Sequence, residues 1–138
     1  MPEFSDCLRQ AMAIRGALGA SLIDHVSGMT VASVGREPGS GRTAMAGPAE
    51  VARATVGGAA FAPSTLPGHV EDIVITAANG YHLLHFVVVV EAPEGAGEPR
   101  SQAFGARLVL YLWLDRMLGN LAMTQRSLRA IGSAMVAG

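Results

Sequence analysis

The chain has 138 residues, half of them apolar, and a formal net charge of -1 from 10 Lys plus Arg against 11 Asp plus Glu. A chain of this length and charge is expected to form one domain with a real core, and its balance of charges does not indicate nucleic acid as a partner. We predict a cytoplasmic protein without membrane insertion. The chain has one cysteine, its N-terminus lacks a secretory signal pattern, and no apolar run approaches the roughly 20 residues of a membrane helix.

The first predicted element is a helix over residues 5–15. Leu8, Ala11 and Met12 recur at the spacing of an amphipathic helix. Cys7 lies within this segment and has no Cys-His signature around it, so a buried apolar role is favoured over that of a nucleophile.

Two short strands are predicted next, over residues 20–24 and 29–34. Both are rich in apolar and β-branched residues, and the polar run HVSG between them indicates a hairpin.

The segment GREPGSGRT, residues 35–43, follows a strand and precedes a helix, which is the setting of a phosphate-binding loop. The spacing differs from that motif, because the second glycine comes one residue late, at Gly41. Arg42 then stands where the motif requires lysine, and arginine is not its equivalent. We therefore expect a flexible connector over about residues 36–46, with no nucleotide and no other cofactor bound.

The second helix is predicted over residues 47–62, with Pro48 at its first helical position. A helix that is apolar nearly all round is normally covered on more than one side, which one small domain hardly supplies. We therefore expect a second copy of the chain to cover it, and an alanine-rich surface helix is the alternative. Projected at about 100° per residue, one side carries Val51, Ala54, Gly57, Gly58 and Phe61, and the other carries Ala52, Thr55, Val56 and Ala59.

Three further strands are predicted. The clearest signal runs from Val70 to Val90, because Asn79-Gly80 is a favoured hairpin turn between two β-rich runs. A polar segment follows, and we expect a flexible loop over about residues 91–103. Residues 106–114 then alternate leucine with other large side chains, which is typical of a strand.

The last predicted helix covers residues 115–132, with Asp115 as its N-cap. The element order is therefore α-β-β-α-β-β-β-α. Antiparallel hairpins covered by helices define an α+β fold around one sheet. We expect residues 1–138 to form a single domain with its core over about residues 4–131.

The chemistry-bearing residues do not assemble into a catalytic set. His82 and His85 lie three apart in a predicted strand, so they point to opposite faces and are not expected to share a metal ion. Surface or hairpin-packing roles are favoured for both. Asp72 and the other carboxylates at turns and strand ends are explained by capping or solvation. We therefore expect a protein that is not an enzyme.

Three segments together resemble the roadblock family of dynein-light-chain domains. They are ASLIDHVSGMTVASVG, VEDIVITAANGYHLLHFV and LVLYLWLDRMLGNLAMTQRSLRAI. The resemblance extends over about residues 4–131 and rests on pattern over length, since no invariant catalytic motif defines the family. It implies a five-stranded antiparallel sheet in the order 2-1-5-4-3, with the second helix on one face and the first and last helices on the other.

The resemblance also implies a homodimer in which the third strands and second helices of two chains pair into one continuous sheet. The side of the helix is taken from the projection, and if the sheet lies against that side, Val51 and Gly58 take over the contact. Carried over by position, the predicted interface consists of Ala52, Thr55, Val56 and Ala59 on the helix and Asp72, Val74 and Thr76 on the strand.

Roadblock proteins bind small Ras-like GTPases, and some bacterial members are encoded in operons with a GTPase and a sensor kinase. The resemblance therefore implies a homodimeric, non-catalytic regulator that binds a Ras-like GTPase and modulates its nucleotide cycle, with the sensor kinase as a further partner. A dimeric scaffold that leaves GTP hydrolysis unchanged is the alternative. A small-molecule sensor is less favoured, because the predicted core is aliphatic with few convergent polar groups.

Overall fold

The computed structural model describes residues 4–39, 42–56, 70–87 and 108–137. Its strands form one antiparallel sheet in the order β2-β1-β5-β4-β3. This confirms the predicted fold class and strand order. The elements in chain order are α1 (Phe4–Met12), β1 (Ala17–Asp24), β2 (Thr30–Gly35), α2 (Arg42–Val56), β3 (Asp72–Ala77), β4 (Gly80–Phe86), β5 (Leu108–Leu114) and α4 (Leu121–Ala137).

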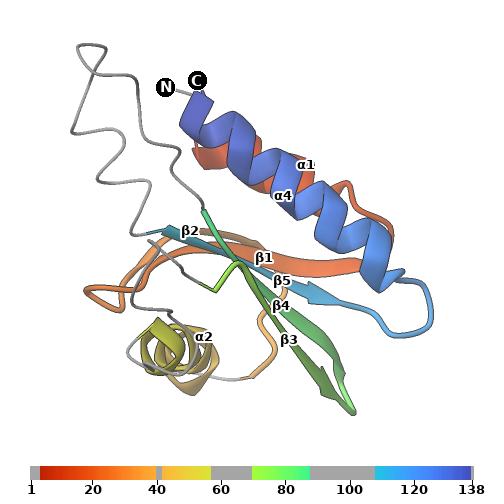
Figure 1. Ribbon diagram of the computed structural model, residues 1–138. Coiled ribbons are helices and arrows are strands. Elements are labelled where there is room, and N and C mark those ends of the chain that lie inside the picture. Colours follow the sequence, from red (N-terminus) through yellow and green to blue (C-terminus); the bar gives the residue numbers. More distant parts are fainter. Residues whose placement is uncertain (1–3, 40–41, 57–69, 88–107, 138) are drawn as a thin grey trace.

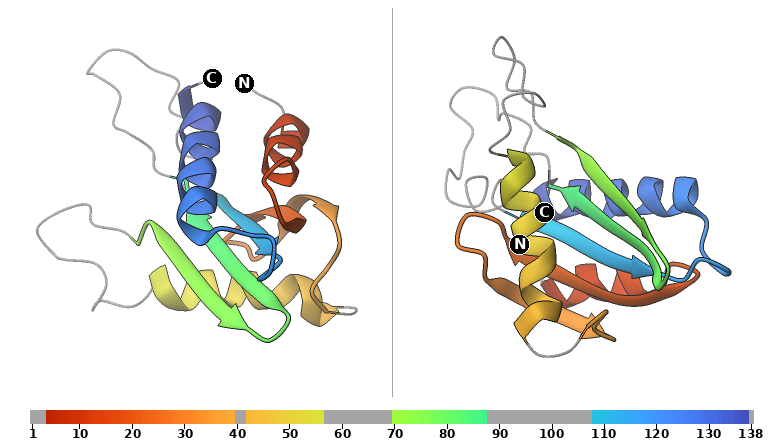
Figure 2. Two further views of the ribbon diagram at one scale, coloured as in Figure 1. Left: turned by 90° about the vertical axis from the view of Figure 1, so that its right-hand side faces the viewer. Right: turned by 90° about the horizontal axis from the view of Figure 1, so that it is seen from below.

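The sheet is covered on both faces. Helix α2 lies on one face, and α1 and α4 lie side by side on the other (Figures 1 and 2). The central strand β5 is buried along its whole length, because its alternate side chains meet helices on opposite faces. Leu110, Leu112 and Leu114 pack toward α1 and α4. On the other face, Tyr111 and Trp113 share the core of α2.

Helix α1 packs through a short apolar stripe that includes Cys7, Leu8 and Ala11, all buried. Burial raises the pKa of the Cys7 thiol, with a smaller contribution from the neighbouring charge of Asp6. The predicted apolar role of Cys7 is confirmed.

Helix α2 begins at Arg42, five residues before the predicted start. Pro48 therefore lies inside the helix, where it has no N–H to donate to the carbonyl of Ala44. The predicted loop over residues 36–46 was wrong in its second half, which is helical. Residues 57–62, where the helix was expected to continue, lie outside the described residues.

Helix α4 begins at Leu121 rather than at Asp115. The carboxylate of Asp115 instead accepts the backbone N–H groups of Met117 and Leu118, at 2.7 and 3.0 Å, and so caps a separate turn. The side-chain oxygen of Asn120 accepts the N–H of Met123 at 3.0 Å and caps the helix.

The β3–β4 hairpin turns at Ala78 and Asn79, one residue before the predicted pair, since Ala77 already pairs with Gly80. Gly80 has a φ of +139°, and a Cβ there would lie 2.7 Å from Nε1 of Trp113. The glycine is therefore needed as the first residue of β4, beneath the indole ring. Within the described residues, no helix is long and apolar enough to cross a membrane.

Candidate interaction surface

Strand β3 lies at one edge of the sheet, with β4 as its neighbour. The carbonyl of Glu71 accepts the N–H of Phe86 at 2.9 Å, which fixes the alternation of hydrogen bonds along this pair. Residues 73, 75 and 77 therefore bond to β4, while the N–H and C=O groups of Asp72, Val74 and Thr76 point away from it. Within the described sheet these outward groups are available to another strand, and they belong to the three predicted strand residues.

Their side chains point to the face of α1 and α4. Val74 is half-buried against that core, and Thr76 is exposed. Asp72 is half-buried and is held by His85 and Arg129. In the strand part of the predicted interface, the groups available to a second chain are therefore mainly backbone N–H and C=O groups.

Helix α2 faces the sheet with the side that carries Ala52, which the prediction had assigned to the dimer contact. Ala49 and Ala52 are buried against the sheet, Ala52 completely at 0% exposure. Among the side chains of α2 that the structure describes, Glu50, Arg53 and Ala54 are exposed, and we call them the outer side of α2. The side chain of Ala52 is therefore covered by the sheet of its own chain. Of the alternative pair, Val51 is half-buried against the same core and Gly58 lies outside the described residues, so the helix part of the interface stays a prediction.

The predicted interface includes three further residues of this helix region, Thr55, Val56 and Ala59. Thr55 is half-buried, and its hydroxyl donates to the carbonyl of Val51 at 2.8 Å within the helix. The side chain of Val56 and the whole of Ala59 lie outside the described residues.

An apolar hollow of ≈ 320 Å³ lies between α2 and the β3–β4 hairpin. Ile75 of β3, at 37% exposure, and Val51 of α2 line it. The sequence reasoning missed Ile75, although strand alternation places it on the face opposite to the three strand residues that were chosen. The lining residues are Pro38, Gly39, Gly47, Pro48, Val51, Ile75, Asn79, His82, Leu84 and Tyr111.

Three polar side chains of the hollow form a hydrogen-bonded chain. His82 Nδ1 lies 2.7 Å from the Tyr111 hydroxyl, and His82 Nε2 lies 2.9 Å from Oδ1 of Asn79. Burial lowers the pKa of His82 and raises that of Tyr111, so both groups are held neutral. A neutral His82 with its proton on Nε2 donates to Asn79 and accepts from Tyr111. The predicted hairpin-packing role of His82 fits this position.

His85 has a buried role that the sequence did not reveal. Its Nδ1 lies 2.7 Å from a carboxylate oxygen of Asp72, directly across the strand pair, and Arg129 of α4 lies 3.4 Å from the other oxygen. Burial alone would raise the pKa of Asp72, but the hydrogen bond and charge of His85, followed by those of Arg129, outweigh burial and lower it. Asp72 therefore ties the edge strand to α4, where solvation had been expected.

No three His, Cys, Asp or Glu side chains in the described parts of the chain gather closely enough to hold a metal ion. His82 and His85 lie on opposite faces of β4, as the strand spacing predicts. His82 stacks near Tyr111 and Trp113 on the face of α2, whereas Nε2 of His85 approaches Gly132 of α4.

The arrangement of these eight elements, with the strand order β2-β1-β5-β4-β3 and helices on both faces, is that of the roadblock fold. Solved structures of this class match the chain closely in shape and distantly in sequence. No protein-family model matches the sequence, and no curated protein matches it. The resemblance inferred from the sequence is confirmed at the level of the fold.

Three of the matched structures cover nearly the whole chain. MglB of Myxococcus xanthus matches with a TM-score of 0.67 and 15% identity, over 99% of this chain and 96% of that one. A Roadblock/LC7 domain from Streptomyces avermitilis gives 0.64 and 11%, over 96% and 94%. A structure described as MglB with a tetrameric arrangement gives 0.65 and 18%, over 96% and 85%.

Proposed function

We propose that the protein is a homodimeric, non-catalytic regulator of the roadblock family that binds a small Ras-like GTPase and modulates its nucleotide cycle. The observation that carries this proposal is the outward backbone of β3 lying beside the apolar hollow, in a protein with the roadblock fold. An edge strand and an exposed apolar hollow are both features that soluble proteins usually cover.

A second copy of the chain covers both the edge strand β3 and the apolar hollow. Pairing of two β3 strands about a two-fold axis satisfies the outward N–H and C=O groups of Asp72, Val74 and Thr76 and joins the two sheets. The α2 helix of each chain then lies over the hollow of the other chain, against the Val51 and Ile75 that line it. The tetrameric arrangement named for MglB is a related precedent for assembly of this fold.

The GTPase part of the proposal is tested with the Ras-like GTPase encoded nearest to this gene, loaded in turn with GDP and with a non-hydrolysable GTP analogue. We expect a complex in size-exclusion chromatography with light scattering, and a changed rate of GTP hydrolysis. Failure to bind in either nucleotide state would contradict the proposal. A complex with unchanged hydrolysis would select the alternative, a dimeric scaffold.

A small-molecule sensor is the second candidate, and the hollow favours it. Asn79, His82 and Tyr111 converge on an otherwise apolar space, a combination typical of ligand sites. A neutral aromatic alcohol such as phenol is a suitable probe, because the stacked ring of Trp113 next to His82 would report its binding by fluorescence. Quenching by phenol that is lost on dimerisation would show that the second copy, not a ligand, fills the hollow.

A further inference from the structure

Three large apolar side chains are exposed where β5 leads into α4. Met117, Leu118 and Met123 are 92%, 56% and 66% exposed, and we call them the methionine tip. The tip lies at the end of the molecule opposite to the β1–β2 turn, since Ala17 of β1 pairs with Leu114 at this end. Apolar residues scattered singly need no explanation, but three such residues within seven positions of one turn form a candidate contact surface.

The backbone under the methionine tip is well ordered by hydrogen bonds. Asp115 accepts the N–H groups of Met117 and Leu118 through its side chain and that of Gly119 through its carbonyl, at 2.9 Å. The N–H of Asp115 in turn donates to the carbonyl of Gly16 at 2.7 Å, which fastens the turn to β1. The exposed side chains therefore stand on a preformed turn, and little backbone entropy is lost when they are covered.

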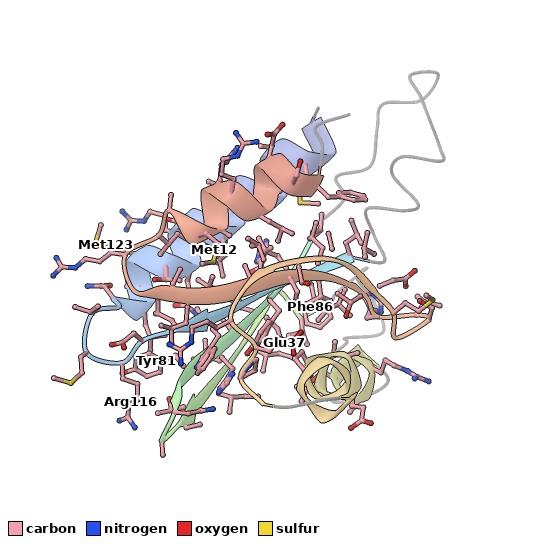
Figure 3. The ribbon with its side chains drawn as sticks, turned by 180° about the vertical axis from the view of Figure 1, so that it is seen from behind. Met12, Glu37, Tyr81, Phe86, Arg116 and Met123 are labelled. Atoms are coloured by element: carbon pink, nitrogen blue, oxygen red, sulfur yellow. The ribbon has the colours of Figure 1, made fainter. Side chains whose placement is uncertain are left out.

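The charges around the methionine tip are positive. Arg116 precedes Met117, Arg126 lies one helical turn after Met123, and Arg15 adjoins Gly16; all three arginines are exposed. Arg116 is held with its guanidinium 5.7 Å from the centre of the Tyr81 ring and donates to the carbonyl of Ala77. Figure 3 shows Arg116, Tyr81 and Met123 at this one end of the molecule.

The carboxylate next to the methionine tip is that of Asp115, and it already accepts hydrogen bonds within the turn. Among the described residues of the turn and the first turn of α4, the carboxylate is that of Asp115, and it accepts two backbone N–H groups. The surface therefore combines apolar side chains with guanidinium groups whose planar donors pair well with carboxylates.

From this combination we infer that the methionine tip docks an acidic amphipathic segment of a partner protein. Apolar side chains of the segment cover Met117, Leu118 and Met123, and its carboxylates pair with Arg116 and Arg126. Thioether side chains adapt to apolar partners of varied shape, which suits a protein segment. Three arginines fall below the cluster of about four to eight basic residues that anionic membranes require, so a lipid surface is disfavoured.

This surface is separate from the one proposed for the homodimer. The methionine tip follows the central strand and continues into α4, on one face of the sheet. The hollow is lined by residues of α2, which lies on the opposite face (Figure 1). A dimer paired through β3 therefore leaves one methionine tip free on each chain. The inference thus goes beyond the proposed function, and the two can fail independently.

The experiment uses the full chain and a fluorescein-labelled helical peptide of about 18 residues, apolar on one side and flanked by glutamates. A matched peptide carries lysine at each glutamate position. Binding is followed by fluorescence anisotropy at two salt concentrations, about 50 and 200 mM. We expect the acidic peptide to bind more tightly than the basic one, and binding to weaken as salt increases.

The variants separate the methionine tip from the rest of the surface. Met117→Ser combined with Met123→Ser should weaken binding of the acidic peptide about tenfold, and Arg126→Gln should weaken it severalfold. Met29→Ser is the matched control, because Met29 is 68% exposed in the β1–β2 turn at the opposite end of the sheet. It should leave the affinity unchanged.

Four results would overturn the inference: no binding of the acidic peptide, equal binding of the basic peptide, equal loss in the Met29→Ser control, or binding of phosphatidylglycerol vesicles in place of the peptide. Light scattering of the tip variants supplies a further check. A shift of the dimer to monomer would mean that a second copy covers the methionine tip, which also overturns the inference.

Discussion

Asp72 of the edge strand connects two other elements of the fold, because it contacts His85 of β4 and Arg129 of α4. Its lowered pKa means that the folded protein holds this carboxylate ionised more strongly than the unfolded chain does, where the pKa is about 3.9. The resulting stability is fully present above that pH, and it is lost as the pH falls through the lower pKa of the folded state.

Asp72→Asn should therefore lower the free energy of unfolding at neutral pH by about 1 kcal/mol, a modest value because Arg129 is largely exposed and its charge is screened. The difference from wild type should close in acid. Urea denaturation at pH values between neutral and about 3 measures both effects. Asp6→Asn is the control, since Asp6 pairs with Arg9 on the exposed side of α1 and should change stability little. A difference that persists undiminished in acid would refute the assignment.

His82 gives a second pH dependence, of different origin. Burial lowers its pKa below the ordinary value of about 6.5, so the unfolded chain takes up the proton first. Stability from this group is complete above that pH and declines as the pH falls toward the pKa of the folded state. We expect an NMR titration of the His82 ring to show a midpoint below about 6.5. His82→Gln should remove this decline from the stability profile, and a midpoint at or above the ordinary value would contradict the burial argument.

At the scale of elements, the start of α4 shows how much the sequence alone could reveal. Asp115 and Asn120 are both good N-cap residues, and the apolar spacing suits either start. The difference lies in tertiary contacts. Gly119 packs against Leu114, where a Cβ would lie 2.4 Å from Cγ, and its N–H donates to Asp115. These contacts hold the turn apart from the helix.

The two caps should differ in their effect on the helix. Asn120→Ala should cost about 1 kcal/mol of stability and lower the helical signal in circular dichroism, because the N–H of Met123 loses its acceptor. Asp115→Ala should cost a similar amount while leaving the helical signal unchanged, since its bonds lie in the preceding turn. A larger loss of helical signal from Asp115→Ala would restore the start of the helix that the sequence predicted.

Strand alternation was predictable from local pattern, and the orientation of α2 was not. The alternating leucines of β5 and the opposite faces of His82 and His85 follow from a period of two. The sequence projection of α2 put apolar residues on both sides, so periodicity could not say which side meets the sheet, and the structure shows Ala52 buried against it. The ion pair of Asp72 with His85 depends on the register of β3 against β4, which sequence patterns did not specify.

Strand β3 offers a clean test of edge pairing. Thr76→Pro removes an N–H that points away from β4, so the β3–β4 ladder should survive while a second β3 loses its donor. We expect light scattering to show that the protein becomes a monomer at micromolar concentration while its circular dichroism is unchanged. Thr76→Val, which retains the N–H, should remain dimeric. A dimeric, folded Thr76→Pro would exclude the proposed strand pairing.

For the molecule as a whole, two separate surfaces imply two separate binding events. The proposed dimer uses β3 and the hollow, and the methionine tip follows the C-terminal end of the central strand on each chain. Light scattering of a mixture of protein and acidic peptide should therefore give a complex of two chains and two peptides. One peptide per dimer would mean that the two tips are not independent.

The central position of β5 has a consequence for how the chain folds. β5 is the last strand to be synthesised, yet it is the strand that joins the β1–β2 hairpin to the β3–β4 hairpin. Its pairing of Ala17 with Leu114 joins residues that lie far apart in the sequence, and such distant pairings are slow to form. On the ribosome, neither hairpin has a sheet to join until Leu114 has emerged. A chain truncated before Leu108 should therefore be open to proteolysis, and folding of the sheet should begin only after Leu114 has been translated.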